Sequence, residues 1–388
     1  MRNFELETYF SQWEFTAKHH MTASDVESMS MQDLLDMGTE EDRCSVNELW
    51  LGYTETWGAP DLRQEIAKTY DKLAPENILC MAGAGEGIYA GMRALLNKGD
   101  HVIVIVPNYQ SAETVPLEIC QVTGVELKHE NDWQLDIDDI KAAIRPNTTL
   151  ISINFPHNPT GALLSKSTLN ALIEVCREHD LYLFSDEVYR GVEIDPADTM
   201  SQIADVYEKG ISLNVLSKAY GLPALRVGWL ASQDQEALQK IERYKHYLSI
   251  CNSGPSERLA IIALKNQQKI FARNRNIIKN NLAELNQFFS NYPTLFDWQP
   301  SQGGCVAFPR YIGPDGVEQF CKSLIEESGV LLLPASLYKS ELMATPVDNF
   351  RIGFGRGEIF KNGLKAMRDH IETKYSDHIT TNRSAQIK

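Results

Sequence analysis

A lysine, a serine and an arginine lie in one turn-rich stretch of the sequence, residues 216–229. Apolar runs enter and leave this stretch, which predicts two strands joined by a turn. A lysine desolvated at the tip of such a turn can be neutral and nucleophilic, as Schiff-base formation requires. Ser217 and Arg226 flank Lys218 with a hydroxyl and a rigid guanidinium, which suit a phosphate. These residues alone leave open the alternative of an exposed turn with ordinary surface charges.

The run VLSKAYGLPALRVGW at 215–229 resembles the lysine motif of the class I/II aminotransferases, which are pyridoxal-phosphate enzymes of fold type I. The resemblance implies that Lys218 is the catalytic lysine that holds pyridoxal 5′-phosphate (PLP). It implies that Ser217 and Arg226 bind the phosphate of this cofactor. It also implies an α/β fold, with a mostly parallel seven-stranded sheet in a large domain and a smaller α/β domain beside it.

Three polar residues follow predicted strands, at the strand ends where parallel sheets bind ligands. Asp186 ends the strand expected at 181–184, Tyr189 follows it, and Asn158 lies in a turn after the strand at 150–154. Alone, the aspartate could cap a helix and the Asn-Pro-Thr-Gly run could be an ordinary turn. The family resemblance assigns Asp186 to the pyridine nitrogen, which the carboxylate keeps protonated, so that the ring withdraws electrons. It assigns Asn158 and Tyr189 to the phenolate oxygen.

A glycine-rich turn, Gly83-Ala84-Gly85, precedes a predicted helix. Backbone N–H groups at a helix start can bind a phosphate, and Gly85 offers no hydroxyl, so only backbone contacts are expected here. The resemblance places the ring of Tyr109 on the pyridine. It places Tyr53 at the phosphate of a partner subunit, which predicts a homodimer with shared active sites.

Two arginines near the end of the chain could bind the carboxylate of an amino acid substrate. Arg351 lies on a predicted strand beside Gly353, and the resemblance gives it the α-carboxylate, which a guanidinium binds through a two-pronged contact. Arg356 is the alternative.

Strands alternate with helices from Leu51 to about residue 230, which predicts a parallel sheet with ligands at the carboxyl ends of its strands. Long helical patterns and short strands follow. Near the N-terminus, Phe4, Phe10, Trp13 and Phe15 predict a helix anchored on the core. Residues from about 373 onward read as a polar tail. We divide the chain into an N-terminal arm or lid that joins the small domain (1–48), a large PLP-binding domain (49–265), and an interdomain helix with a small C-terminal domain (266–388).

The composition narrows the class of partner. The net charge of −15 argues against nucleic acid and against an anionic membrane surface. Seven scattered cysteines without a Cys-x-x-Cys pair indicate reduced thiols in a cytoplasmic protein. The histidines show no metal-binding spacing, so no metal is expected. The start of the chain is acidic and polar, unlike a signal peptide, and its longest apolar runs are too short for a membrane span.

A finer resemblance, to PLP-dependent cyclases of the capreomycidine synthase type, rests on segments 154–162, 216–229 and 303–310. Such enzymes eliminate the hydroxyl of a hydroxyarginine and let its guanidine close a ring, without transferring an amino group. We therefore favour dehydration and cyclisation of a hydroxyarginine to a cyclic guanidino amino acid of the capreomycidine or enduracididine type. The alternative is an aminotransferase that moves an amino group between an amino acid and a 2-oxo acid, which the segment 185–190 resembles more. A non-catalytic binding protein is a third class, which the complete set of site residues disfavours.

The arm offers groups for the side chain of such a substrate. Its acidic residues could pair with a guanidinium, and His19 or His20 could carry protons. A solvated acidic face is the ordinary alternative. We take Glu7 and His20 as the substrate-binding candidates. The acidic residues considered are Glu5, Glu7, Asp25 and Glu27.

Overall fold

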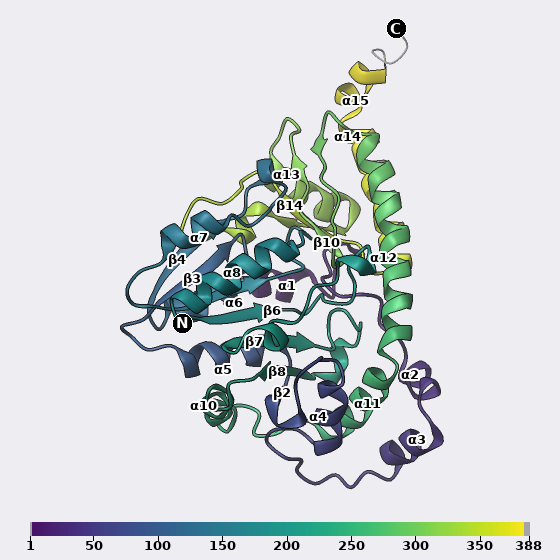
Figure 1. Ribbon diagram of the computed structural model, residues 1–388. Helices are drawn as coiled ribbons and strands as arrows, with labels where there is room; N and C mark the ends of the chain where they lie inside the picture. The colour runs from purple at the N-terminus through teal and green to yellow at the C-terminus, as the bar shows by residue number, and fades with distance from the viewer. Residues whose placement is uncertain (1, 384–388) are drawn as a thin grey trace.

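A seven-stranded sheet forms the centre of the protein in the computed structural model, which describes residues 2–383 (Figure 1). Its strands are β2 (Ile78–Met81), β3 (His101–Val106), β4 (Gln121–Glu126), β5 (Thr148–Asn154), β6 (Tyr182–Asp186), β7 (Gly210–Val215) and β8 (Gly228–Ser232). The spatial order is β2-β8-β7-β6-β5-β3-β4. β8 runs antiparallel to both of its neighbours and the other pairs are parallel. The predicted mostly parallel seven-stranded sheet is confirmed.

Helices cover both faces of this sheet, because alternate strand residues point to opposite sides. Val102 and Val104 pack into one core, whereas Ile103 and Ile105 pack into the other. This double burial explains the unbroken apolar run of β3. The first core is closed by α5 (Ala84–Leu95) and α10 (Gln235–Lys245), and the second by α7 (Ile137–Ala143) and α8 (Lys166–Glu178). Shorter helices, α6 (Ser111–Leu117) and α9 (Ile203–Val206), complete this part.

A smaller α/β region follows the sheet in the sequence. It begins after α11 (Gly254–Lys265) with α12 (Gln267–Ser290), a long helix along one side of the molecule (Figure 1). β10, β14 and β13 form a small antiparallel sheet. The elements are β9 (Phe296–Asp297), β10 (Val306–Ala307), β11 (Arg310–Tyr311), α13 (Val317–Ser323), a π-helical turn (Leu324–Ser328), β12 (Val330–Leu331), β13 (Leu333–Pro334), β14 (Phe350–Gly353), α14 (Glu358–Lys374) and α15 (Ser376–Arg383).

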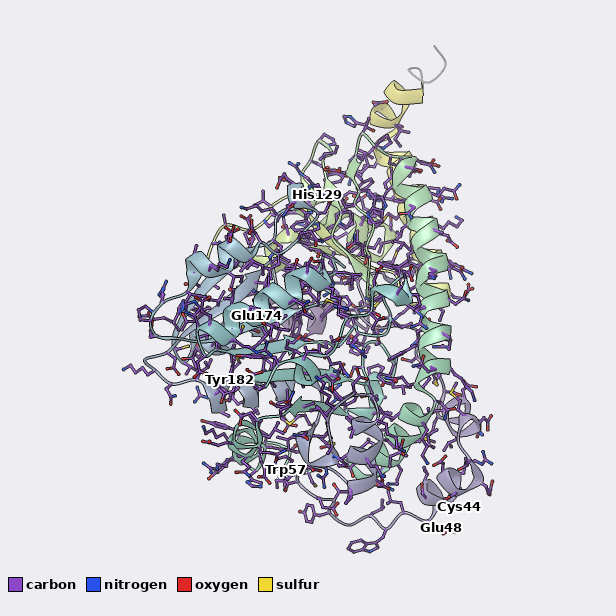
Figure 2. The ribbon with its side chains drawn as sticks, in the orientation of Figure 1. Cys44, Glu48, Trp57, His129, Glu174 and Tyr182 are labelled. Atoms are coloured by element: carbon purple, nitrogen blue, oxygen red, sulfur yellow. The ribbon has the colours of Figure 1, made fainter. Side chains whose placement is uncertain are left out.

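The N-terminal arm connects the two parts. Its elements are α1 (Glu5–Trp13), β1 (His19–His20), α2 (Met31–Met37) and α3 (Glu40–Asn47), and α4 (Pro60–Ala67) follows them. β1 pairs in parallel with β12, in the smaller region, whereas α1 packs against the large sheet's second core. Figure 2 shows Cys44 and Glu48, at the end of α3, on the outer edge of the molecule. The boundaries after residues 48 and 265 remain predictions.

Two expectations at the chain ends are wrong. Phe15 is 93% exposed because α1 ends before it, so it does not anchor the arm. The expected polar tail is helical as far as residue 383, since α14 continues to Lys374 and Tyr375 is buried against the core. The rest of that expected tail, 384–388, lies outside the described residues. No helix within residues 2–383 combines the length and apolarity needed to cross a bilayer.

Candidate active site

Lys218 lies in the hairpin turn between β7 and β8. Gly221 and Arg226 adopt left-handed backbone conformations, with φ of 69° and 50°, which help the chain to reverse. Burial lowers the pKa of the Lys218 ammonium. Its Nζ donates a hydrogen bond of 2.7 Å to Ser24 Oγ. The turn thus presents an amine that loses its proton more readily than an exposed lysine, which suits a nucleophile.

Asp186 and Asn154 are the last residues of neighbouring strands, β6 and β5, and they stand opposite each other in register. Asn154 donates from Nδ2 to the Asp186 carbonyl oxygen at 2.9 Å, and its Oδ1 accepts from the backbone of Asn158 at 2.9 Å. Burial raises the pKa of Asp186 to about 6. A buried carboxylate of this kind is stabilised in its charged form by a cationic partner.

The start of α5 and the lysine hairpin form a cradle. Gly83, which precedes α5, has φ of 108°, and a Cβ built on it would lie 2.5 Å from Arg226 Nη2. Arg226 Nη1 in turn donates to Ser217 Oγ at 3.4 Å. Ala84 and Gly85 line the same cavity, and a Cβ on Gly85 would meet nothing within 4 Å. Helix N–H groups, a guanidinium and a hydroxyl converge here as a phosphate site requires.

Arg351 reaches this cavity from β14 in the smaller region, and only 1% of its surface is exposed. Its Nη1 donates to Asn158 Oδ1 at 3.2 Å, and its Nη2 donates to the Thr22 carbonyl oxygen at 2.8 Å. Arg356 instead forms a two-pronged ion pair with Asp25, with both contacts at 3.0 Å. Arg351 is therefore the arginine whose charge is not neutralised by a carboxylate in these contacts.

One face of α1 lines the cavity through Glu7, Phe10 and Glu14, at positions i, i+3 and i+7. Glu7 accepts a hydrogen bond of 2.8 Å from the Tyr109 hydroxyl. The Phe10 ring lies 5.8 Å from the centre of the Arg351 guanidinium. The pKa of Glu14 is raised by burial and, next, by the negative charge of Glu7. The two carboxylates therefore form an anionic pair at the cavity.

The segment after β1 contributes further groups to the cavity. Ser24 accepts from Lys218 through Oγ, and its carbonyl oxygen accepts from the Tyr189 hydroxyl at 2.9 Å. His20 also lines the cavity, where burial lowers its pKa to about 4. Its Nδ1 accepts weakly from the Thr22 backbone at 3.4 Å, so the ring is neutral near pH 7.

These groups surround one cavity of about 440 Å³ at the carboxyl ends of β5, β6 and β7. Most of the predicted site residues line it, and Gly83 lies at its edge through its approach to Arg226. The predicted residues that line it are Glu7, His20, Ala84, Gly85, Tyr109, Asn158, Asp186, Tyr189, Ser217, Lys218, Arg226 and Arg351. Sequence reasoning missed Glu14, Ser24 and Phe10 as cavity residues.

Several candidates lie elsewhere. Tyr53 is 88% exposed and does not line the cavity of its own chain. Glu27 does not line the cavity either: it accepts from the Gly357 backbone at 2.7 Å, and Glu5 accepts from Asn3 at 2.9 Å. His19 is also outside the cavity lining. The expectation that Glu5, Glu27 or His19 faces a substrate is therefore wrong for the cavity as described.

A buried lysine hairpin, a strand-end carboxylate and a helix-start phosphate cradle around one cavity define a PLP-dependent enzyme of fold type I. The cradle is a fit for the cofactor's phosphate because a Cβ at Gly83 would fill it. The chain belongs to the aminotransferase class I and II family, whose sequence model matches residues 24–358. Its cofactor is therefore pyridoxal 5′-phosphate.

Three known proteins illustrate the similarity. Capreomycidine synthase of Streptomyces vinaceus is 27% identical over 376 residues, covering 95% of this chain and 93% of that protein. A PLP-dependent aminotransferase from Streptococcus suis superposes with a TM-score of 0.88 at 29% identity, covering 96% of this chain and 98% of that one. The PLP-dependent cyclase OrfR superposes with a TM-score of 0.87 at 25% identity, with the same coverage. The fold and family resemblances drawn from the sequence are confirmed, and the protein is an enzyme.

Proposed function

We propose that the residues around the cavity hold PLP in the roles expected from the sequence. Lys218 is the attachment point, Asp186 faces the pyridine nitrogen, and Arg351 receives the substrate's α-carboxylate. The cofactor supplies a pyridine ring that withdraws electrons from the substrate's Cα. The phosphate is held by Gly83, Ala84, Gly85, Ser217 and Arg226, the ring is stacked by Tyr109, and the phenolate oxygen is contacted by Asn158 and Tyr189.

The proposed reaction is the dehydration and cyclisation of a hydroxyarginine to a cyclic guanidino amino acid of the capreomycidine or enduracididine type. The observation that carries this proposal is the anionic pair formed by Glu7 and Glu14 on the cavity face of α1. A cation placed beside Glu14 relieves its unfavourable burial and the repulsion from Glu7. Similarity to capreomycidine synthase and to the cyclase OrfR supports the same reaction.

Charge placement orients such a substrate in one direction. Arg351 binds the α-carboxylate, while the guanidinium at the other end of the side chain is directed to Glu14 on the arm. A charge-assisted hydrogen bond contributes about 1.5–3 kcal/mol, which corresponds to roughly tenfold to a hundredfold preference over a neutral side chain. Asp25 is less available, because Arg356 already pairs with it.

The chain's own groups account for the proton transfers. Lys218 Nζ removes the proton from Cα, and the electrons of that C–H bond become a new carbon–carbon double bond. The side-chain hydroxyl leaves with the electrons of the C–O bond and gains a proton, so that water is released. A guanidine nitrogen then adds to the carbon that lost the hydroxyl, and Cα regains a proton. The product is the substrate less one water, with its α-amino nitrogen retained.

An ordinary aminotransferase is the second candidate. The Streptococcus suis aminotransferase superposes as well as OrfR does, so the backbone favours neither reaction. Residues 185–190, on and after β6, also resemble general aminotransferases. The two candidates differ in whether a 2-oxo acid is needed.

Mass spectrometry of reaction mixtures tests the proposal. The enzyme is incubated with 3-hydroxyarginine and with 4-hydroxyarginine, each with and without pyruvate or 2-oxoglutarate. Loss of one water with all nitrogen retained, and without a 2-oxo acid, is the expected result. Product that forms only with a 2-oxo acid, which itself becomes aminated, overturns the cyclase proposal in favour of the aminotransferase.

We further propose a cytoplasmic homodimer in which Tyr53 serves the partner's phosphate. Large apolar side chains near Tyr53 are exposed, among them Trp50 at 83% and Tyr247 at 91%. Thr54 donates from its hydroxyl to the Asn252 carbonyl oxygen at 3.2 Å, which links the chain segments that carry these side chains. Covering such a surface is favourable at roughly 25 cal/mol per Å² of apolar area.

A further inference from the structure

Ser24 is bonded to two groups at the reacting end of the cavity. Its Oγ lies 2.7 Å from Lys218 Nζ, and its carbonyl oxygen lies 2.9 Å from the Tyr189 hydroxyl. The contact with the lysine spans 194 positions in the sequence, so it exists only when the arm is folded over the sheet. Val26, two residues on, is fully buried in the core and fixes this part of the arm.

The direction of the hydrogen bond leaves Ser24 able to act on something else. Lys218 donates and Ser24 Oγ accepts, so the serine keeps its own hydroxyl hydrogen for a further acceptor. Ser24 lines the cavity together with Glu14, which is placed to receive the far end of the substrate. Its hydroxyl therefore lies between the lysine that handles the Cα proton and the arm that receives the side chain.

Elimination of a hydroxyl needs an acid at that position. Hydroxide leaves poorly, whereas water leaves readily, so the leaving oxygen must gain a proton as its bond to carbon breaks. His20 is neutral near pH 7 because burial lowers its pKa to about 4, so it is a poor source. The Tyr189 hydroxyl is engaged with the Ser24 carbonyl oxygen.

We propose that Ser24 is a catalytic residue that relays a proton from Lys218 to the leaving hydroxyl of the substrate. The lysine ammonium, formed by taking the Cα proton, gives a proton to Ser24 Oγ while the serine gives its own to the leaving oxygen. The C–O bond breaks with its electrons on oxygen, and water departs. Both side chains return to their starting protonation, and no oxidant or reductant is required. This role rests on the proposed dehydration.

The test compares three holoenzyme variants with the wild type. Ser24→Ala removes the relay, Ser24→Thr keeps a hydroxyl, and Ser28→Ala makes the same change at an exposed position of the same segment. Each is assayed for PLP content by its visible absorbance, for deuterium uptake at Cα of L-arginine in D₂O, and for water loss from hydroxyarginine. Cofactor content and deuterium uptake report on Lys218 independently of the elimination.

We expect Ser24→Ala to lose roughly a hundredfold or more in water loss, the usual contribution of a general acid. Its PLP content and deuterium uptake should stay within about threefold of the wild type by the same reasoning. Ser24→Thr and Ser28→Ala should retain water loss. Equal losses of exchange and elimination in Ser24→Ala would mean that the serine only positions Lys218, and unchanged elimination would mean that it does nothing. Either result overturns the proposal.

Two further outcomes are separable. If Ser24→Ala does not fold or load cofactor, Ser24→Cys replaces it, since a thiol of similar size is a weak donor. Undiminished water loss in loaded Ser24→Cys overturns the relay, and a selective decrease supports it. If the wild type itself releases no water from either hydroxyarginine, the proposed function fails and the relay fails with it. That failure is visible without any variant.

Discussion

The cavity has a floor and a cover that are built differently. The floor consists of strand ends and hairpin turns of the large sheet, which carry Lys218 and Asp186. The cover is the arm, where α1 and the segment after β1 bring Glu14 and Ser24 to the same space. Floor residues are held by neighbouring strands in fixed register, whereas cover residues depend on contacts between distant parts of the chain.

This difference separates two tasks. The floor supplies groups that suit any PLP enzyme of the family, because they face the cofactor. The cover supplies a carboxylate and a hydroxyl that face the substrate side chain, and these choose the reaction. Substitutions in the floor should therefore damage all chemistry, and substitutions in the cover should alter selectivity.

The largest effect is expected at Lys218. Lys218→Ala should abolish the borohydride-reducible link to PLP and lower Cα deuterium exchange by roughly 10⁴-fold, because the base is lost. Absorbance, borohydride trapping and exchange measured by mass spectrometry check this. Lys240→Ala, which removes an exposed lysine paired with Glu236, is the control. A reducible Schiff base at wild-type level in Lys218→Ala would show that the wrong lysine has been assigned.

The floor's carboxylate should impose a pH-dependent cost on the cofactor-free protein. The pKa of folded Asp186, about 6, exceeds the ordinary value of 3.8, so the folded state binds more protons between these limits. Its contribution to the free energy of unfolding therefore falls as pH rises from about 4 to about 6. At about 1.4 kcal/mol per pKa unit, Asp186→Asn should stabilise the cofactor-free protein by up to about 3 kcal/mol at pH 7.

Urea unfolding of cofactor-free protein between pH 4 and pH 8 measures this effect. The stabilisation by Asp186→Asn should shrink to nothing near pH 4, and Asp180→Asn at an exposed position should show no such trend. Added PLP should stabilise the wild type more than the variant. A variant less stable than the wild type at pH 7 would contradict the assigned burial cost.

A cover substitution should act on substrate binding. Glu14→Gln should raise KM for a guanidino substrate by roughly tenfold to a hundredfold, with a smaller change in kcat, because a charge-assisted contact is lost. Steady-state kinetics against hydroxyarginine measure both constants. Glu5→Gln on the same helix, outside the cavity, is the matched control. An unchanged KM would remove Glu14 from the guanidinium site.

The smallest effect is expected at Tyr53. Tyr53→Phe should weaken PLP retention by about tenfold through loss of one hydrogen bond to the phosphate, while leaving the dimer intact. Equilibrium dialysis gives the cofactor affinity, and sedimentation at low micromolar concentration gives the assembly state. A fully active monomer would remove the cross-subunit role.

Most of the floor could be predicted from the sequence, because buried strands leave a short apolar signature and ligands gather at their carboxyl ends. Asn154 and Asp186 illustrate this, since they end adjacent strands. Strand β4 gave no such signal: it lies at the sheet edge, and Val125 alone among its residues is buried. The roles assigned to individual floor residues, including Tyr109 and Arg351, remain predictions.

The cover could be predicted only in part. Glu7 and Glu14 share a face of α1, and their spacing was a usable signal once the helix bounds were known. Ser24 had no such signal, because it lies in an irregular segment whose position is set by contacts with Lys218 and Tyr189. Phe15 shows the opposite error, since an aromatic residue was taken as an anchor although the helix ends two residues earlier.

The close approach of Gly83 to Arg226 also bears on how this enzyme can diversify. A side chain at Gly83 would strike the guanidinium and would also strain a backbone with φ of 108°, so the two positions can vary only in concert. Such epistasis makes the phosphate cradle a poor target for directed evolution. Glu14 contacts the cavity through a terminal carboxylate, and replacements there displace no backbone. Libraries intended to change the accepted amino acid should therefore leave the cradle fixed and randomise the cavity face of α1.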